Sequence, residues 1–121
     1  MHGILFDLQM NKKFEIVFLE PAIDFLDSLD LKTRRKIYYN LDKAKLGLDP
    51  KLFKKLTDDI WEFRTKFSGK QYRLFAFWDR TDKKETLVIS THGIIKKMRK
   101  VPKIEIEKAI RIKKDYFEQK R

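Results

Sequence analysis

The sequence predicts a single α+β domain in which a small, largely antiparallel sheet is flanked by an N-terminal helical hairpin and a C-terminal helix. Three observations lead to this prediction. Apolar residues recur with a helical period as far as Leu48, and with the period of a strand over residues 60–95. A helical period returns after Pro102. Successive strands joined by short polar turns pair as an antiparallel meander, so the predicted order is βααβββα.

The first part of the chain predicts a strand and two helices. Residues 14–19 are rich in β-forming side chains, and Pro21 suits the first turn of the helix that follows. Asp30 is a suitable N-cap for a second helix, which ends near Gly47. The two helices then form an antiparallel hairpin. Their apolar stripes consist of Ala22, Phe25, Leu26 and Leu29 in the first helix and of Ile37, Leu41, Ala44 and Leu48 in the second.

The second part predicts three strands and a last helix. Residues 60–67 alternate, with aromatic residues and Thr65 on one face and charged residues on the other. The Ser68-Gly69 turn leads into a strand over residues 72–79, and a polar turn leads into another over residues 86–95. Residues 104–119 predict a helix that buries Ile106, Ala109, Ile110 and Phe117.

Length and composition indicate one folded domain over residues 1–121, in which residues 1–12 form a flexible N-terminal extension. A content of 42% hydrophobic residues is too high for a disordered chain. The absence of Cys excludes disulfides, a thiolate nucleophile and a zinc-thiolate site. Asp7, Gln9 and Asn11 interrupt the short apolar stretch near the start, so we expect a soluble cytoplasmic protein without a signal peptide or spanning segment.

The charge balance favours a polyanionic partner. Lys and Arg number 29 against 18 Asp and Glu, a net charge of +11, and nucleic acid is the leading candidate. The alternative is that the charge serves solubility alone. A membrane-surface role has less support, since no segment combines one apolar face with one basic face.

The chain lacks the motifs of most enzyme classes. We find no P-loop, dinucleotide fingerprint, HExxH pair or GxSxG elbow, and two His without Cys supply a metal site poorly. The sequence therefore predicts no metal and no cofactor.

Cations and aromatic residues are interleaved on the predicted strands, a mixture that suits single-stranded RNA. Aromatic or guanidinium planes stack on bases, while cations neutralise phosphates. The alternative is that the strand aromatics belong to the core. The candidates in this interleaved set are Trp61, Arg64, Lys66, Tyr72, Arg73, Trp78, His92, Lys96, Lys97, Arg99 and Lys100.

Arg64 and Arg73 need a reason to be in apolar strands, because an unpaired buried guanidinium is costly. One reading is a structural ion pair, for which Glu62 is a possible partner. The other is a phosphate clamp, since Arg offers a planar, permanently charged fork. Sequence alone leaves both readings open.

His92 and the cations after it are the candidates for chemistry. Metal-free RNA cleavage needs a base for the 2′-hydroxyl, charge stabilisation at the phosphorus and an acid for the leaving oxygen. His92 can serve as base or acid, lysines crowded by other cations are an alternative, and a satisfied structural His is a third reading. Residues 96–100 are the densest positive run and flank the predicted site.

Residues 56–117 contain a set of short motifs whose order and spacing are specific together. In order, these are Trp61-Glu62-Phe63-Arg64, Tyr72-Arg73, His92-Gly93, Lys96-Lys97, Pro102 and the helix start from Glu105 to Ala109. In these motifs the chain resembles the phage-derived, HigB-like branch of the RelE/ParE toxin superfamily. The resemblance implies a RelE-like fold, an antitoxin that often carries a helix-turn-helix domain, and cleavage of mRNA in the ribosomal A site. It points to Arg64, Arg73, His92, Lys96 and Lys97 as site residues.

The resulting hypothesis is the toxin of a type II toxin-antitoxin system, a ribosome-dependent, metal-independent endoribonuclease that inhibits translation and forms a hetero-oligomer with its antitoxin. In it Arg64 and Arg73 hold the scissile phosphate and His92 transfers a proton. The alternatives are a ParE-like poison of DNA gyrase and a nonenzymatic RNA-binding domain. The remaining RNA contacts in this hypothesis come from Lys66, Tyr72, Trp78, Lys96, Lys97, Arg99 and Lys100.

Overall fold

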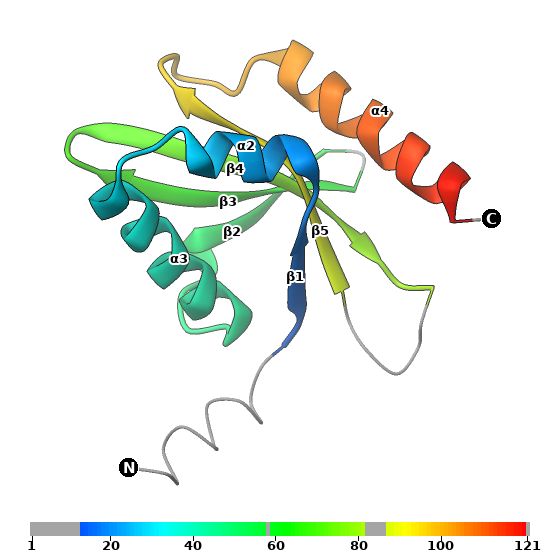
Figure 1. The fold of residues 1–121 in the computed structure, drawn as a ribbon, viewed down its shortest axis with the longest axis horizontal. Helices are drawn as coiled ribbons and strands as arrows, with labels where there is room; N and C mark the ends of the chain where they lie inside the picture. Colours follow the sequence, from blue (N-terminus) through cyan, green and yellow to red (C-terminus); the bar gives the residue numbers. More distant parts are fainter. Residues whose placement is uncertain (1–12, 58, 82–86, 121) are drawn as a thin grey trace, which may run out of the picture.

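The chain folds into a five-stranded mixed sheet with helices on both faces (Figure 1). This computed structural model describes residues 13–57, 59–81 and 87–120. The predicted extension over residues 1–12 and part of the turn after Arg80 lie outside the described residues. The elements are β1 (Glu15–Phe18), α2 (Glu20–Asp27), α3 (Leu31–Lys45), the 3-10 turn η1 (Pro50–Leu52), β2 (Phe53–Thr57), β3 (Ile60–Phe67), β4 (Lys70–Asp79), β5 (Leu87–Lys96) and α4 (Lys103–Gln119).

The strand order β1-β5-β4-β3-β2 confirms the predicted α+β class. Strands β2 to β5 pair antiparallel, whereas β1 lies parallel to β5. The prediction missed β2, an edge strand on which Lys54 and Lys55 are both exposed. Two consecutive lysines do not give the alternation of a half-buried strand, and lysines on an edge discourage pairing with another chain.

Local signals explain where the hairpin elements begin and end. Pro21 lies in the first turn of α2, as predicted. The Asp30 carboxylate accepts a hydrogen bond from the backbone N–H of Thr33 at 2.8 Å, which caps α3. Gly47 follows α3 with a φ of 69°, a conformation that favours glycine. Helices α2 and α3 thus form the predicted hairpin.

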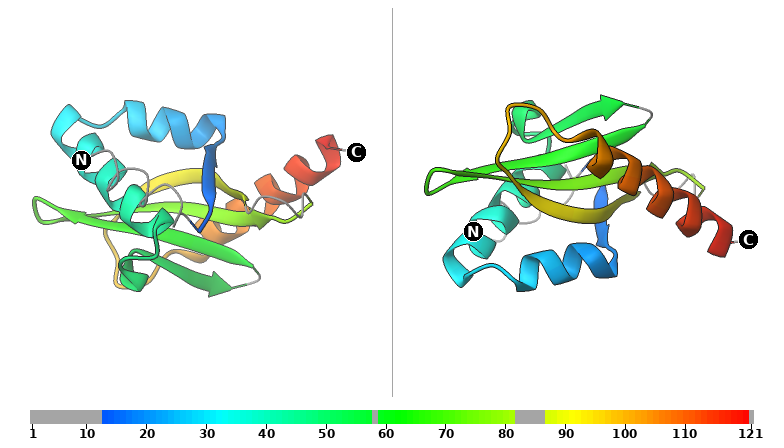
Figure 2. Two further views of the ribbon diagram at one scale, coloured as in Figure 1. Left: turned by 90° about the horizontal axis from the view of Figure 1, so that it is seen from below. Right: turned by 90° about the horizontal axis from the view of Figure 1, so that it is seen from above.

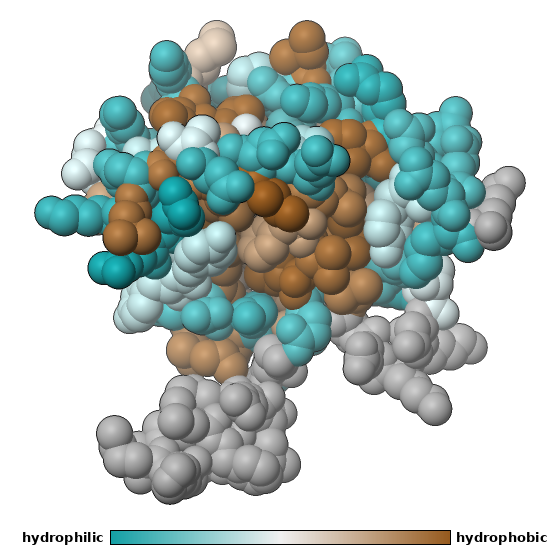
Figure 3. All heavy atoms as spheres, viewed as in Figure 1, coloured by the Kyte–Doolittle hydropathy of each residue, from teal (hydrophilic) through white to brown (hydrophobic). Residues whose placement is uncertain are grey.

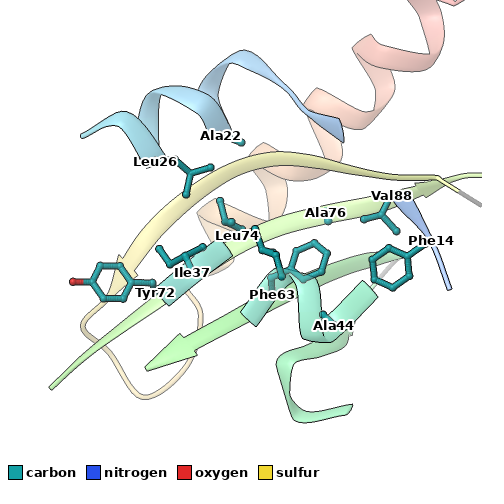
Figure 4. Packing of buried hydrophobic residues seen from close by; sticks show 11 residues of the cluster. Phe14, Ala22, Leu26, Ile37, Ala44, Phe63, Tyr72, Leu74, Ala76 and Val88 are labelled. Atoms are coloured by element: carbon teal, nitrogen blue, oxygen red, sulfur yellow. The ribbon is translucent and has the colours of Figure 1, made fainter. Parts of the chain in front are cut away.

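The sheet separates two apolar layers. Figure 2 shows the helices that cover its two faces. Helices α2 and α3 pack on one face, where Phe63, Leu74 and Val88 of the sheet meet Leu26 and the inner stripe of α3 (Figure 4). Helix α4 packs on the other face. The buried residues of that second layer are Ile60, Phe75, Phe77, Ile89 and Ala109. None of the helices in the described part of the chain is long and apolar enough to cross a membrane.

A β-bulge in β5 sets the direction of His92. Leu74 on β4 is opposite Gly93 on β5, and Ala76 is opposite Ser90. Two residues of β5, Thr91 and His92, therefore lie opposite one residue of β4, Phe75. The extra residue interrupts the alternation. His92 therefore lies on the α4 side of the sheet, as Ile89 does. In an uninterrupted strand, residues 89 and 92 would point to opposite faces.

Two polar contacts hold α4 on the sheet. Near its start, Glu105 lies 3.0 Å from Nε2 of His92. Near its end, the carboxylate of Asp79 accepts hydrogen bonds from the Tyr116 hydroxyl at 2.6 Å and from Lys120 Nζ at 2.8 Å. Burial alone would raise the pKa of Asp79, but the hydrogen bonds from Lys120, Tyr116 and Thr81 outweigh it and hold that pKa below its usual value.

Candidate nucleic-acid interface

On the α4 side of the sheet, polar side chains occupy two neighbouring positions at which β3, β4 and β5 are paired. We call each such set of register partners a row. In one row Lys66 of β3, Gln71 of β4 and Lys96 of β5 are register partners. In the next row Arg64 lies opposite Arg73. Because alternate residues of a strand point to the same face, these side chains share the face that holds Glu62 and Phe75. Helix α4 packs on the sheet around Phe75, and the lysines of these two rows stay at least partly accessible.

Arg64 and Lys66 are accessible, whereas Arg73 is buried. Arg73 is 2% exposed, and its Nε lies 2.9 Å from Oε1 of Glu62, which is also buried. The two atoms form an ion pair without the alignment of a hydrogen bond. Arg73 also donates to Gln71 Oε1 at 2.7 Å. Burial lowers the pKa of Arg73, and the carboxylate of Glu62 opposes that effect.

This geometry decides between the two readings of the strand arginines. Arg73 makes the structural ion pair, with the Glu62 partner that the sequence suggested for Arg64. The expected contact of Arg73 with a phosphate is not available in this structure, because its guanidinium is enclosed by the protein. Arg64 is only half-buried and can reach a ligand.

His92 is also enclosed, at 2% exposure. Its Nδ1 lies 3.0 Å from the Thr91 hydroxyl, its Nε2 lies 3.0 Å from Glu105, and its ring centroid lies 4.9 Å from that of Phe75. Burial lowers the pKa of His92 below 6.5, Glu105 opposes the shift and Lys108 adds to it. Both ring nitrogens are engaged, so the expected direct proton transfer to RNA is not possible in this arrangement.

Lys97, Arg99 and Lys100 are exposed on the loop that joins β5 to α4 (Figure 2, right). The loop starts at Lys96, in the row that contains Lys66. The predicted position of these cations beside the site therefore agrees with the structure.

Tyr72 and Trp78 lie on the opposite face of the sheet. Tyr72 is 5% exposed in the layer under α2 and α3. Trp78 packs edge-on against Phe14 and Trp61, at centroid distances of 5.2 and 5.9 Å. Neither ring can stack a base beside Arg64, so the expectation that they share this site is corrected: both belong to the packing of the other layer.

Lys54 is a site residue that sequence analysis missed. It is the register partner of Glu62, which places it on the same face as Arg64, and it is exposed. Its position became visible only with β2, because a lysine followed by another lysine has no assigned face in the sequence. We name the accessible set Lys54, Arg64, Lys66 and Lys96 the cation patch.

In the described ranges no three His, Cys, Asp or Glu side chains are grouped so that they could hold a metal ion. The groups that the cation patch offers are fixed positive charges and hydrogen-bond donors. Such groups bind phosphates and stabilise charge that develops on a phosphoryl group.

Comparison with known families adds one finding. Residues 24–114 match the family described as phage-derived protein Gp49-like (DUF891), which is associated with RelE-like toxins. The match covers the second half of α2, the whole of α3 and the cation patch. No curated protein matches the chain.

Proposed function

Because this chain belongs to the family of phage-derived Gp49-like proteins, we propose that it is the toxin of a toxin-antitoxin pair and that it cleaves RNA at the cation patch. The finer proposal is a ribosome-dependent mRNA endoribonuclease neutralised by a cognate antitoxin of the helix-turn-helix class. Its setting is the cytoplasm. The observation that supports it best is the cation patch, a group of accessible positive charges on a rigid sheet.

In the described strands, the acid that shares a register row with a patch cation is Glu62, the partner of Lys54. It is buried and paired with Arg73, so it does not balance the accessible charges. None of the four patch cations forms an ion pair within the described residues. A charged surface without internal partners is suited to neutralise successive phosphates.

Arg64 is the residue that we place on the scissile phosphate. Arg64 is the register partner of Arg73, and the buried ion pair of Arg73 with Glu62 links the two strands at this point. A planar guanidinium can bind two phosphoryl oxygens at once and stabilise the charge that forms when the 2′-oxygen attacks. Lys54, Lys66 and Lys96 then hold the neighbouring phosphates, with the loop cations outside them.

Arg73 and His92 become positioning residues in this proposal. Arg73 fixes Glu62 and supports the strand that carries Arg64, whereas His92 fixes Glu105 and so the start of α4 and the loop before it. The attacking 2′-hydroxyl loses its proton to solvent water, and a lysine of the patch donates a proton to the leaving 5′-oxygen, since these ammonium groups are the accessible donors there. A direct role for His92 requires Glu105 to release Nε2.

The experiment is to map mRNA 5′ ends after a short pulse of expression without antitoxin, with the parent chain and Arg64→Gln in parallel. We expect new ends in translated frames for the parent, and at least a hundredfold fewer for Arg64→Gln, the scale reported for loss of one transition-state donor, about 10²–10³. Arg111→Gln, on the outer side of α4, is the matched control and should cleave like the parent.

The other outcomes identify the alternatives. Growth arrest with intact mRNA and broken DNA would support a gyrase poison instead. RNA binding without cleavage or arrest would leave a binding domain. For His92, a folded His92→Gln protein that cleaves with the parent's pH profile supports a positioning role, and loss of one limb of that profile would show direct proton transfer.

A further inference from the structure

Helix α3 carries a second basic surface, on the opposite side of the sheet from the cation patch. Its sequence contains six basic residues and one acidic residue. The acid, Asp42, is already paired with Lys45 at 3.2 Å. Figure 3 shows hydrophilic side chains over this helix. Arg34 donates to the backbone carbonyl of Leu29 at 2.9 Å, and among the described residues no acid forms an ion pair with the remaining basic side chains of the helix.

One stripe of α3 combines this charge with an exposed aromatic ring. Tyr39 is 57% exposed, and Lys36 Nζ and Lys43 Nζ lie 5.1 and 5.6 Å from its ring centroid. Lys32 extends the stripe by one turn, since spacings of three and four residues share a helix face. We call Lys32, Lys36, Tyr39 and Lys43 the α3 stripe; it is about 16 Å long at 1.5 Å per residue.

The stripe is held rigidly. Ile37, Leu41 and Ala44 are buried beneath it, and Asn40 donates a hydrogen bond to the Thr65 hydroxyl on β3 at 3.1 Å. Lysines one turn apart repel each other, which costs a few tenths of a kcal/mol per pair in a helix. Core packing explains the inner face of α3 but not this outer arrangement.

We propose that the α3 stripe binds RNA that contains an unpaired nucleotide, with Tyr39 against the base and the flanking ammonium groups on its phosphates. An aromatic face between cations has the complementary arrangement to a nucleotide. An acidic protein partner is the less favoured occupant, because Tyr39 is largely exposed between two ammonium groups, whereas the residues that dominate protein interfaces cluster in desolvated pockets. The site is separate from the proposed cleavage and does not depend on it.

The probe is an RNA hairpin with an unpaired loop and 2′-O-methyl riboses, which cannot be cleaved through the 2′-oxygen. Binding is measured by fluorescence anisotropy over a range of salt concentrations. All proteins carry Arg64→Gln and Lys66→Gln, so the cation patch contributes less. On this background Lys36→Gln/Lys43→Gln is compared with Arg111→Gln/Lys114→Gln, a charge-matched pair on the outer face of α4.

We expect the α3 pair to weaken binding at least tenfold and to reduce the slope of log K against log salt by about 1.5, since each phosphate contact contributes roughly 0.7–0.9. Tyr39→Ala should weaken binding of the hairpin roughly tenfold, but not binding of a fully paired duplex. The α4 pair should cause less than half of the change in slope.

Equal losses for the α3 and α4 pairs would overturn the proposal, because the attraction would then be general charge. Tighter binding of polyglutamate than of the hairpin at matched charge would overturn the choice of RNA and favour an acidic protein. Loss of cleavage in the Arg64→Gln protein bears only on the cation patch, so failure of one proposal is distinguishable from failure of the other.

Discussion

Arg64 and Arg73 lie directly opposite each other on β3 and β4, two positive side chains at one position of the sheet. Like charges in this relation destabilise a strand pair. Arg64 also contributes to the lowering of the pKa of Arg73, after burial itself. The buried carboxylate of Glu62 offsets both effects, so the accessible Arg64 depends on a charge that no ligand can reach.

Removing either partner of the buried pair should destabilise the protein. Glu62→Ala leaves Arg73 charged and enclosed, and we expect a loss of about 3–5 kcal/mol in the free energy of unfolding. Replacement of both residues by Met should recover most of that loss, because an apolar pair of similar volume carries no desolvation cost. Urea unfolding measures both, and a double variant as unstable as Glu62→Ala would contradict the account.

Gly93 should not tolerate even a methyl group. A Cβ built there would lie 2.2 Å from Cδ2 of Phe25 on α2, closer than atoms can approach. We expect Gly93→Ala to cost about 1–3 kcal/mol, as overpacking does. Phe25→Leu in the same chain should restore part of the loss in thermal unfolding; without such a recovery, the contact with Phe25 is not the cause.

The stability of the protein should fall as the pH is lowered from 7 towards 5. The pKa of His92 is lower in the folded chain than its value of 6.5 in the unfolded chain, so between the folded-state and unfolded-state pKa values the unfolded chain binds more protons. The contribution of His92 to stability is therefore complete above pH 6.5 and is lost as the pH falls to the folded-state pKa. Urea unfolding at several pH values should show this loss for the parent and a flatter profile for His92→Gln, whereas parallel profiles would refute it.

The end of α4 should loosen when the Asp79 charge is removed. Asp79→Asn weakens the hydrogen bonds from Tyr116 and Lys120, which are far from this residue in sequence. We expect faster amide hydrogen exchange in the last two turns of α4 and little change near Glu105, since local stability follows local contacts. Uniformly faster exchange along α4 would mean that Asp79 stabilises the whole helix.

The sequence predicted the sheet and hairpin because their periods, caps and turns are local signals. It did not predict the side on which His92 lies, since one extra residue at Thr91-His92 leaves no trace in composition or spacing. It also could not show that Glu62 pairs across strands with Arg73.

The sequence does predict the face on which some side chains lie, and it misses others because one strand was not recognised. Alternation along β4 already separates Tyr72 from Arg73, so their opposite faces were predictable. Lys54 needed β2 to be recognised first. The exposed residues of the cation patch agree with the predicted cations at Arg64, Lys66 and Lys96, while burial, which depends on the packing of α4, decided the rest.

The parallel pairing of β1 with β5 has a consequence for how the nascent chain matures. Val17 pairs with Ile89, 72 positions later in the chain (89 − 17), and β5 is also the strand that connects β1 to β4. The last strand to be synthesised is therefore the one that joins the others, and such long-range pairing is slow to form. A chain released before Leu87 can pair β2, β3 and β4, but β1 has no neighbouring strand until β5 has been made.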